Sequence, residues 1–90
     1  MSQAVVDPNE LRRFAHNLKR FNEDLQMSLA GLHGQMLTLS ETWRDQEHDK
    51  FVQEFETTLK MLEHFMEATS VHVPFLMHKA ERIEEYLQQR

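Results

Sequence analysis

The sequence predicts an all-α protein: a two-helix antiparallel hairpin that dimerises into an antiparallel four-helix bundle. Two observations predict the helices. The 90 residues include only two Gly and two Pro, and the second half of the chain carries apolar residues at alternating steps of three and four. A third observation, the unequal length of the two predicted helices, predicts the dimer. We expect a single domain that spans residues 1–90.

The first predicted helix spans about residues 8–39 and has a strong start signal. Asp7 can cap it by accepting hydrogen bonds from backbone N–H groups, and Pro8 falls where a missing N–H has no cost. Glu10 falls at the third helical position, from which its carboxylate can reach back to the cap. Together these three residues predict a helix that begins at Pro8.

Apolar residues recur along the first helix, but their spacing contains one irregularity. Two consecutive steps of four occur at Phe21, Leu25 and Leu29, and such a stutter locally unwinds a left-handed supercoil. Gly31 and Gly34 each weaken the helix by up to about 1 kcal/mol relative to Ala. Because the apolar phase continues through them, we expect an unbroken helix; a break near Gly31 is the alternative. The apolar series is Leu11, Phe14, Leu18, Phe21, Leu25, Leu29, Leu32, Met36, Leu39 and Trp43.

The segment of about residues 40–45 is predicted to form the turn between the helices. Asp45 is favoured as the cap of the second helix over the two hydroxyl residues of this segment. With Asp45 as the cap, Glu47 and Asp49 place acidic charge in the first turn, near the positive end of the helix dipole.

The second predicted helix spans about residues 46–89 and carries an unbroken seven-residue repeat. Its sites alternate at three and four residues over about five heptads, which keeps them on one side of an α-helix. Thr69 is the one polar member. Pro74 removes a backbone hydrogen bond, but the repeat keeps its phase, so we expect a continuous helix kinked near Pro74, with a break at residues 70–73 as the alternative. The repeat consists of Val52, Phe55, Leu59, Leu62, Met66, Thr69, Val73, Leu76, Ala80, Ile83 and Leu87.

The second helix is longer than the first, and this difference predicts a partner. If the chain folds back at about Trp43, facing residues have numbers that add up to about 86, and Leu11 lies beside Phe75 or Leu76. The second helix then projects beyond the first by about ten residues, or roughly 15 Å. The preceding segment 4–6 is too short to cover this projection, which carries Ala80, Ile83 and Leu87.

Two hairpins packed antiparallel would cover both the projection and the flanks of the apolar stripes. The sequence therefore predicts a homodimer, with a hetero-partner of similar shape as the main alternative. The expected dimer interface consists of Leu32, Met36, Leu39, Trp43, Phe51, Phe55, Ala80, Ile83, Tyr86 and Leu87.

Composition argues against several classes of function and location. The formal net charge of −5 argues against a nucleic-acid binder, because that affinity comes from Lys and Arg neutralising phosphates. No apolar run reaches the length of about 18 residues that a membrane span needs, and the first seven residues do not resemble a cleavable signal peptide. We expect a cytoplasmic protein, or one secreted by a route that needs no signal peptide.

The side chains with chemical potential do not form a catalytic or metal-binding pattern. None of the six histidines lies three or four residues from another, and no Glu is followed by His three residues later, so the spacings of helical zinc and di-iron sites are missing. No Gly-x-Ser-x-Gly elbow or phosphate-binding glycine loop occurs. We expect no enzyme activity, no cofactor and no metal site.

The turn carries the residues of a known family. Trp43, Arg44 and Asp45 lie between two amphipathic helices, with Leu39 before and Phe51 and Phe55 after. In this respect nearly the whole chain resembles the Trp-X-Gly hairpin proteins of type VII secretion systems, the early-secreted-antigen-like family. Two positions depart from the family pattern, and the chain is most similar to its Trp-X-Asp homodimers. Asp45 stands where the family has Gly. In the family an acidic residue often lies four positions after a Tyr near the C-terminus, and here Arg90 lies four positions after Tyr86.

The resemblance implies a dimeric helical bundle that acts as a secreted effector, an adaptor or a carrier for other exported proteins, without a cofactor. It also implies that the Trp turn of one subunit meets the C-terminal tail of the other. The main alternative function is a cytoplasmic structural or regulatory coiled-coil module with no role in secretion, and a further alternative is a metal- or ligand-binding bundle.

Overall fold

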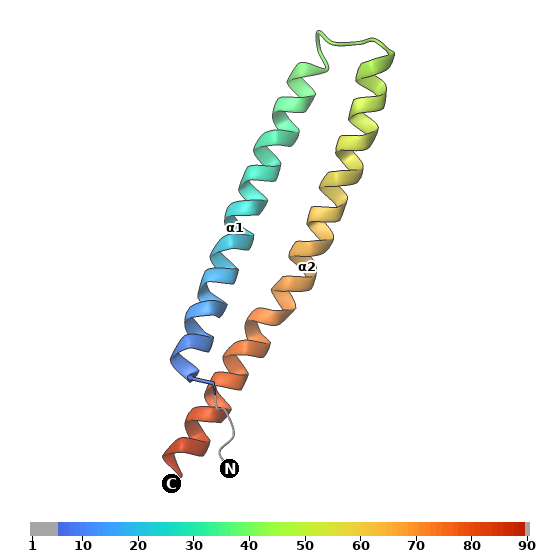
Figure 1. Ribbon diagram of the computed structural model, residues 1–90. Helices are drawn as coiled ribbons and strands as arrows, with labels where there is room; N and C mark the ends of the chain where they lie inside the picture. The colour runs from blue at the N-terminus through green and yellow to red at the C-terminus, as the bar shows by residue number, and fades with distance from the viewer. Residues whose placement is uncertain (1–5, 90) are drawn as a thin grey trace.

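The computed structural model describes residues 6–89, which form a hairpin of two long helices (Figure 1). Helix α1 spans Pro8–Leu39 and helix α2 spans Gln46–Gln88. The two helices run side by side in opposite directions, and the molecule measures 68 × 22 × 15 Å. The described residues contain helices and turns alone, which confirms the all-α hairpin.

Helix α1 begins at its cap and continues without interruption. The carboxylate of Asp7 accepts a hydrogen bond from the backbone N–H of Asn9 at 2.9 Å, and Pro8 occupies the first helical position. The bond expected from Glu10 back to the cap is absent among the described residues. Gly31 and Gly34 lie inside the helix, so the alternative of a break near Gly31 is wrong.

The side of α1 that faces α2 differs from the predicted series at two positions. Ala15 is buried and Asn22 is half-buried, whereas Phe14 and Phe21 are 59% and 50% exposed. With Ala15 and Asn22 in place, the inward residues alternate at four and three, and the predicted stutter drops out of the interface between the helices. This inward row consists of Leu11, Ala15, Leu18, Asn22, Leu25, Leu29 and Met36. Leu32 continues the same spacing but is 46% exposed.

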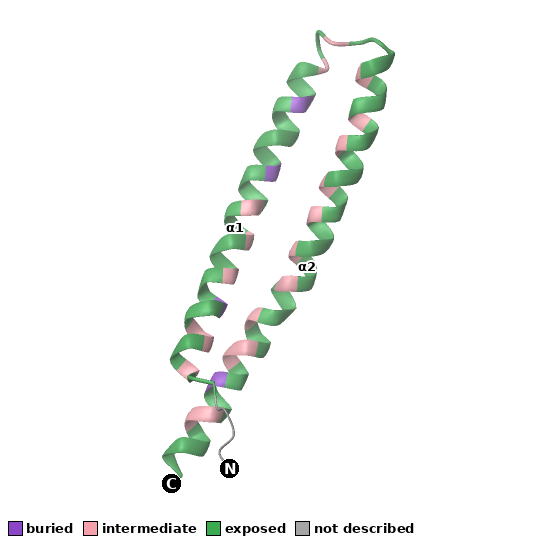
Figure 2. Ribbon diagram, in the orientation of Figure 1, coloured by how far each residue is buried: buried purple, intermediate pink, exposed green. Residues whose placement is uncertain are grey.

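Helix α2 is continuous through Pro74, so the alternative of a break at residues 70–73 is wrong; a kink at Pro74 stays a prediction. Every member of the seven-residue repeat from Val52 to Ile83 is buried or half-buried, while Leu87 is exposed. Figure 2 shows these positions as a pink and purple line on the side of α2 that faces α1.

The two helices pair in a register that differs from the predicted one. The Asn22 amide donates to Thr69 Oγ1 at 2.8 Å, and the residue numbers of this pair add up to 91. Two other contacts join the helices, Phe21 with Phe65 and Arg12 with Glu84. Their residue numbers add up to 86 and 96. The two sums are 5 below and 5 above 91, as expected for contacts on the two flanks of one seam between helices. The seam register is therefore 91, whereas a fold-back at Trp43 predicts 86.

The register differs because the chain keeps turning after α1 ends. The backbone N–H of Trp43 donates to the carbonyl of Leu39 at 3.0 Å, and Thr42 bonds to the same carbonyl at 3.2 Å. These bonds carry the chain through nearly another helical turn, so the fold-back lies closer to Arg44 and Asp45.

The shifted register shortens the projecting end of α2. Residue numbers that add up to 91 place Leu11 opposite Ala80 and Pro8 opposite Ile83. Ala80 has no exposed surface and Ile83 is half-buried. The expectation that both project beyond α1 is therefore wrong, and the projecting part begins only after Ile83. The sequence predicts that segment 4–6 covers part of this end. Residues 4 and 5 of that segment lie outside the described residues.

Candidate interaction surface

The hairpin buries few side chains and exposes many large apolar ones (Figure 2). Its buried side chains within residues 6–89 are Ala15, Leu29, Met36 and Ala80. Among the described residues, fourteen large hydrophobic ones are at least 40% exposed. Because exposed apolar area of this extent marks interaction sites in soluble proteins, the candidate functional site is a surface.

The exposed aromatic residues gather on one side of the hairpin. Phe14 and Phe21 lie seven residues apart on α1, so they share one row of that helix. On α2, Phe51, Phe65 and Tyr86 are separated by multiples of seven. The rings of Phe21 and Phe65 meet edge to face with centroids 6.2 Å apart, which places both rows on the same flank of the seam.

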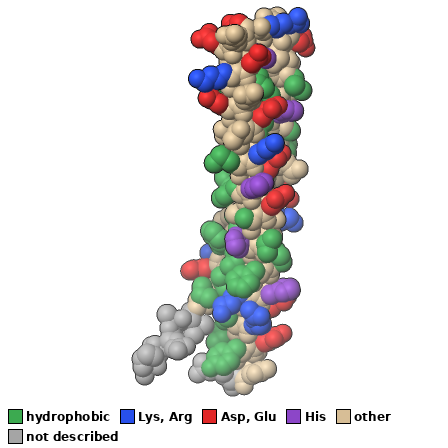
Figure 3. All heavy atoms as spheres, turned by 90° about the vertical axis from the view of Figure 1, so that its right-hand side faces the viewer, with side chains coloured by type: hydrophobic (Ala, Val, Ile, Leu, Met, Phe, Trp, Pro, Cys, Tyr) green, Lys and Arg blue, Asp and Glu red, His purple; other side chains and the backbone are tan. Residues whose placement is uncertain are grey.

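Met61 and Phe75 extend this surface across α2. They are 66% and 59% exposed and occupy the row next to that of Phe65. Figure 3, in which α2 faces the viewer, shows exposed hydrophobic side chains gathered towards the end that holds the chain termini. We call the surface formed by Phe14, Phe21, Phe51, Met61, Phe65, Phe75 and Tyr86 the aromatic face.

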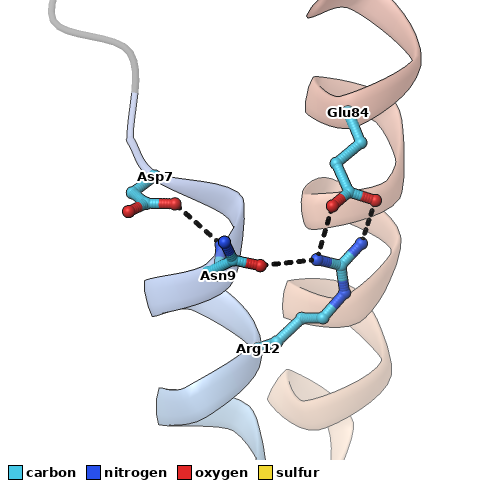
Figure 4. Close-up of polar contacts among 4 residues, drawn as sticks. All are labelled: Asp7, Asn9, Arg12 and Glu84. Atoms are coloured by element: carbon cyan, nitrogen blue, oxygen red, sulfur yellow. Dashed lines mark hydrogen bonds and ion pairs between the residues drawn. The ribbon is translucent and has the colours of Figure 1, made fainter. Parts of the chain in front are cut away.

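The opposite flank of the seam is polar. Arg12 forms a two-pronged ion pair with Glu84, with one Nη–Oε distance of 2.8 Å (Figure 4). Arg12 also donates to the side chain of Asn9 at 3.3 Å, so the start of α1 is connected to the end of α2. The hydrogen bond from Arg12 lowers the pKa of the Glu84 carboxyl, and the same bond raises the pKa of Arg12.

An open groove continues along this polar flank towards the turn. Its polar lining includes Gln26, His33, Glu56 and Glu63, and the apolar Leu29, Leu59 and Met66 of the seam also line it. On the aromatic face the corresponding space is filled by the rings of Phe21 and Phe65. The hairpin therefore has two chemically different faces.

The Trp-led turn is built from packed rings and a helix cap. The ring of Trp43 lies 5.2 Å from that of His48 and 5.7 Å from that of Phe51, between centroids. Asp45 accepts a hydrogen bond from the backbone N–H of His48 at 3.0 Å and caps α2. Ser40 Oγ lies 2.6 Å from His48 Nε2, so His48 connects both sides of the turn.

The predicted interface residues are distributed over three levels of burial. Leu32, Leu39, Phe51, Tyr86 and Leu87 are exposed, and Trp43, Phe55 and Ile83 are half-buried. Met36 is 6% exposed and Ala80 is fully buried within the subunit. These last two residues have little surface left for a partner in the single hairpin, and the interface as a whole stays a prediction.

Sequence reasoning missed four residues of the aromatic face: Phe14, Phe21, Met61 and Phe75. A signal for them was present. Phe14 and Phe21 are seven residues apart and Met61 and Phe75 fourteen, which places each pair on one row of its helix. Only the contact between Phe21 and Phe65 shows that the rows of the two helices share a flank.

Residues 6–89 contain no group of three or more His, Asp or Glu side chains that could hold a metal ion. In the same part of the chain, no helix combines the length and apolarity that crossing a membrane requires.

A family model described as "Proteins of 100 residues with WXG" matches residues 3–88. The chain belongs to the WXG100 family. WXG100 proteins are small helical proteins associated with type VII secretion, so the resemblance inferred from the Trp43 turn is confirmed. No curated protein and no solved structure matches the chain significantly.

Asp45 occupies the position of the Gly in the WXG100 motif, and the turn accommodates it without strain. Its φ of −96° and ψ of −175° describe extended backbone, and no described non-Gly residue has a positive φ. The left-handed conformation for which Gly is favoured is therefore not needed here. Asp45 adds a side-chain cap that Gly cannot supply.

Proposed function

We propose that this WXG100 protein is a protein-binding module of a type VII secretion system, whose subunits pair through their aromatic faces as an antiparallel four-helix bundle. In this role it serves as an effector, an adaptor or a carrier for exported proteins. The observation that carries the proposal is the aromatic face, which one hairpin leaves open to solvent.

The energetics of the hairpin support a partner on this face. Full burial of one Phe or Met side chain contributes about 1.5–3 kcal/mol, and the aromatic face presents seven large side chains that are at least 40% exposed. Within one subunit, two helices form a single seam and leave both flanks of that seam uncovered. A second hairpin laid on the aromatic face would produce the shared core of a four-helix bundle.

The association test compares serine substitutions on the two faces. Phe75→Ser and Met61→Ser remove apolar surface from the aromatic face and should raise the dimer dissociation constant by about tenfold or more each, at about 1.4 kcal/mol per decade. Leu37→Ser is the matched control, because Leu37 is 55% exposed and lies seven residues beyond Ala30 of the polar groove. Sedimentation equilibrium measures all three. A wild-type protein that is folded and monomeric at micromolar concentration contradicts the proposed dimer.

The secretion role is tested in the native cell. The protein should accumulate in the medium of intact cells and should stay inside cells in which the type VII machinery is inactivated. A cytosolic marker protein controls for lysis. Equal retention of this protein in both strains would favour the alternative of a cytoplasmic coiled-coil module.

A further inference from the structure

One exposed row of α2 is symmetric in its chemistry. Going outward from Ala68 in steps of seven, Met61 and Phe75 are both large and apolar, and Glu54 and Arg82 carry opposite charges. All five side chains are exposed. We call these residues, Glu54, Met61, Ala68, Phe75 and Arg82, the central row.

The neighbouring row of α2 has its midpoint half a residue away from Ala68. Phe51 and Tyr86 are aromatic residues near its two ends, on either side of a midpoint between residues 68 and 69, while its inner members, Thr58, Phe65, His72 and Lys79, show no such symmetry. Because Phe65 contacts Phe21 of α1, this row belongs to the aromatic face. The central row lies beside it, since Met61 precedes Phe65 by one helical turn. The symmetric central row therefore lies on the surface through which we propose that subunits pair.

Two identical helices that pack antiparallel about a twofold axis bring together residues whose numbers add up to a constant. We propose that two copies of this chain pair through α2 in this way, with the twofold axis at Ala68 and a constant of 136. This inference rests on the proposed function and specifies the partner and register of the same surface.

The register places complementary groups against each other. Glu54 lies beside Arg82 of the second copy, and Met61 lies beside Phe75 of the second copy. By symmetry each of these pairs occurs twice. Ala68 meets Ala68 of the second copy at the axis. Its small side chain allows the two α2 helices to lie at the usual interaxial distance of packed helices, about 8–10 Å.

The charges also select the direction of the pairing. In a parallel pairing at equal height, Glu54 would face Glu54 and Arg82 would face Arg82, and such like-charge contacts disfavour an interface. In the antiparallel pairing both contacts become attractive. A foreign partner would need to present the same sequence of charge and apolar surface, which a second copy already carries.

The position of helix α1 is compatible with this axis. The seam register of 91 places residue 23 of α1 at the height of Ala68. The same axis then pairs α1 residues whose numbers add up to 46, so Phe14 lies opposite Leu32 of the second copy. Both side chains are exposed in the single hairpin, Leu32 to 46%. Residue 23 is also near the middle of α1, Pro8–Leu39, so the two copies overlap along almost their full length.

Disulfide cross-linking tests the position of the axis. The chain contains no Cys, so Ala68→Cys introduces one thiol per subunit. Under mild oxidation this variant should form a disulfide-linked dimer, because a disulfide needs Cα atoms within about 7 Å. Ser70→Cys is the matched control: Ser70 is exposed two residues away and lines the polar groove. It should remain largely unlinked at the same protein concentration.

Charge exchange tests the pairing of the central row. Glu54→Arg and Arg82→Glu should each raise the dissociation constant by about tenfold at low ionic strength, because each creates two like-charge contacts per dimer. The double variant should return to within about threefold of wild type, and 1 M NaCl should reduce the effect of either single substitution. Circular dichroism confirms that each variant keeps its helix content.

The outcomes separate this inference from the proposed function. A wild-type dimer in which Ala68→Cys does not cross-link, or in which the double charge variant is no tighter than the single ones, overturns the register at Ala68 and leaves the dimer standing. A wild-type protein that sediments as a monomer overturns both. Selective cross-linking at residue 68 with recovery in the double variant supports the register.

Discussion

Asp45 stabilises the start of α2 through a hydrogen bond that glycine cannot make. Its carboxylate accepts the backbone N–H of His48 at 3.0 Å, and its own backbone is extended. The N-terminal N–H groups of a helix lack partners within the helix, so a side-chain acceptor at this position removes an unsatisfied donor. At the scale of the single residue, the departure from the Trp-X-Gly pattern therefore contributes stability to the turn.

Replacing Asp45 should separate its cap from its backbone conformation. We expect Asp45→Ala to lower the free energy of unfolding by about 0.5–2 kcal/mol. Asp45→Gly should lower it by only about a few tenths of a kcal/mol, because Gly is tolerated at the cap position. Chemical denaturation at one fixed protein concentration measures both. Asp49→Ala is the control, since Asp49 lies in the first turn without serving as the cap. Equal losses for the Ala and Gly variants would contradict the cap assignment.

At the scale of the elements, one polar pair interrupts the apolar seam between α1 and α2. Asn22 and Thr69 are half-buried and bond to each other at 2.8–3.0 Å. Thr69 Oγ1 also lies 3.0 Å from the carbonyl of Phe65 in its own helix. A polar pair in such a seam favours the register in which both partners meet, because any other register leaves them buried without hydrogen bonds.

The two members of this pair should respond differently to removal. Thr69→Val leaves the half-buried Asn22 amide without its partner and should destabilise the hairpin by about 1–3 kcal/mol. Asn22→Leu leaves Thr69 bonded to the Phe65 carbonyl and adds apolar surface to the seam, so it should be neutral or stabilising. Thermal unfolding at fixed protein concentration measures both variants. A larger loss for Asn22→Leu than for Thr69→Val would contradict the role assigned to this pair.

The whole molecule is a thin rod with one aromatic face and one polar face. Its radius of gyration is 20.3 Å, well above the value of about 12 Å expected for a compact domain of this length. A rod this thin cannot bury its apolar residues within one subunit, which is why the aromatic face remains open. Its polar face, with the Arg12–Glu84 ion pair and the groove, stays available in the dimer that we propose.

Small-angle X-ray scattering should distinguish lateral from end-to-end association. Two fully overlapping hairpins keep the long dimension near 68 Å, and their radius of gyration should exceed that of one hairpin by only about 1 Å, because packed helices lie about 8–10 Å apart. An end-to-end dimer would nearly double the maximum dimension. That result would contradict the antiparallel bundle even if the molecular mass were that of a dimer.

Local sequence was sufficient to place the helices. Asp7 and Asp45 cap α1 and α2 as the sequence predicts, because a cap depends on hydrogen bonds to residues two or three positions away. The repeat from Val52 to Ile83 likewise faces α1, because periodicity along one helix decides which residues share a side.

The register of the two helices, and with it the exposed face, was decided only by the tertiary structure. The predicted constant of 86 depends on where the chain folds back, and the seven-residue repeat of one helix does not show how far the chain keeps turning before the next helix begins. The extra turn that ends at Trp43 and the Asn22–Thr69 pair select the observed constant of 91. That choice buries Ala80, leaves Phe14 and Phe75 exposed, and thereby moves the interaction surface from the end of α2 to the flank of the hairpin.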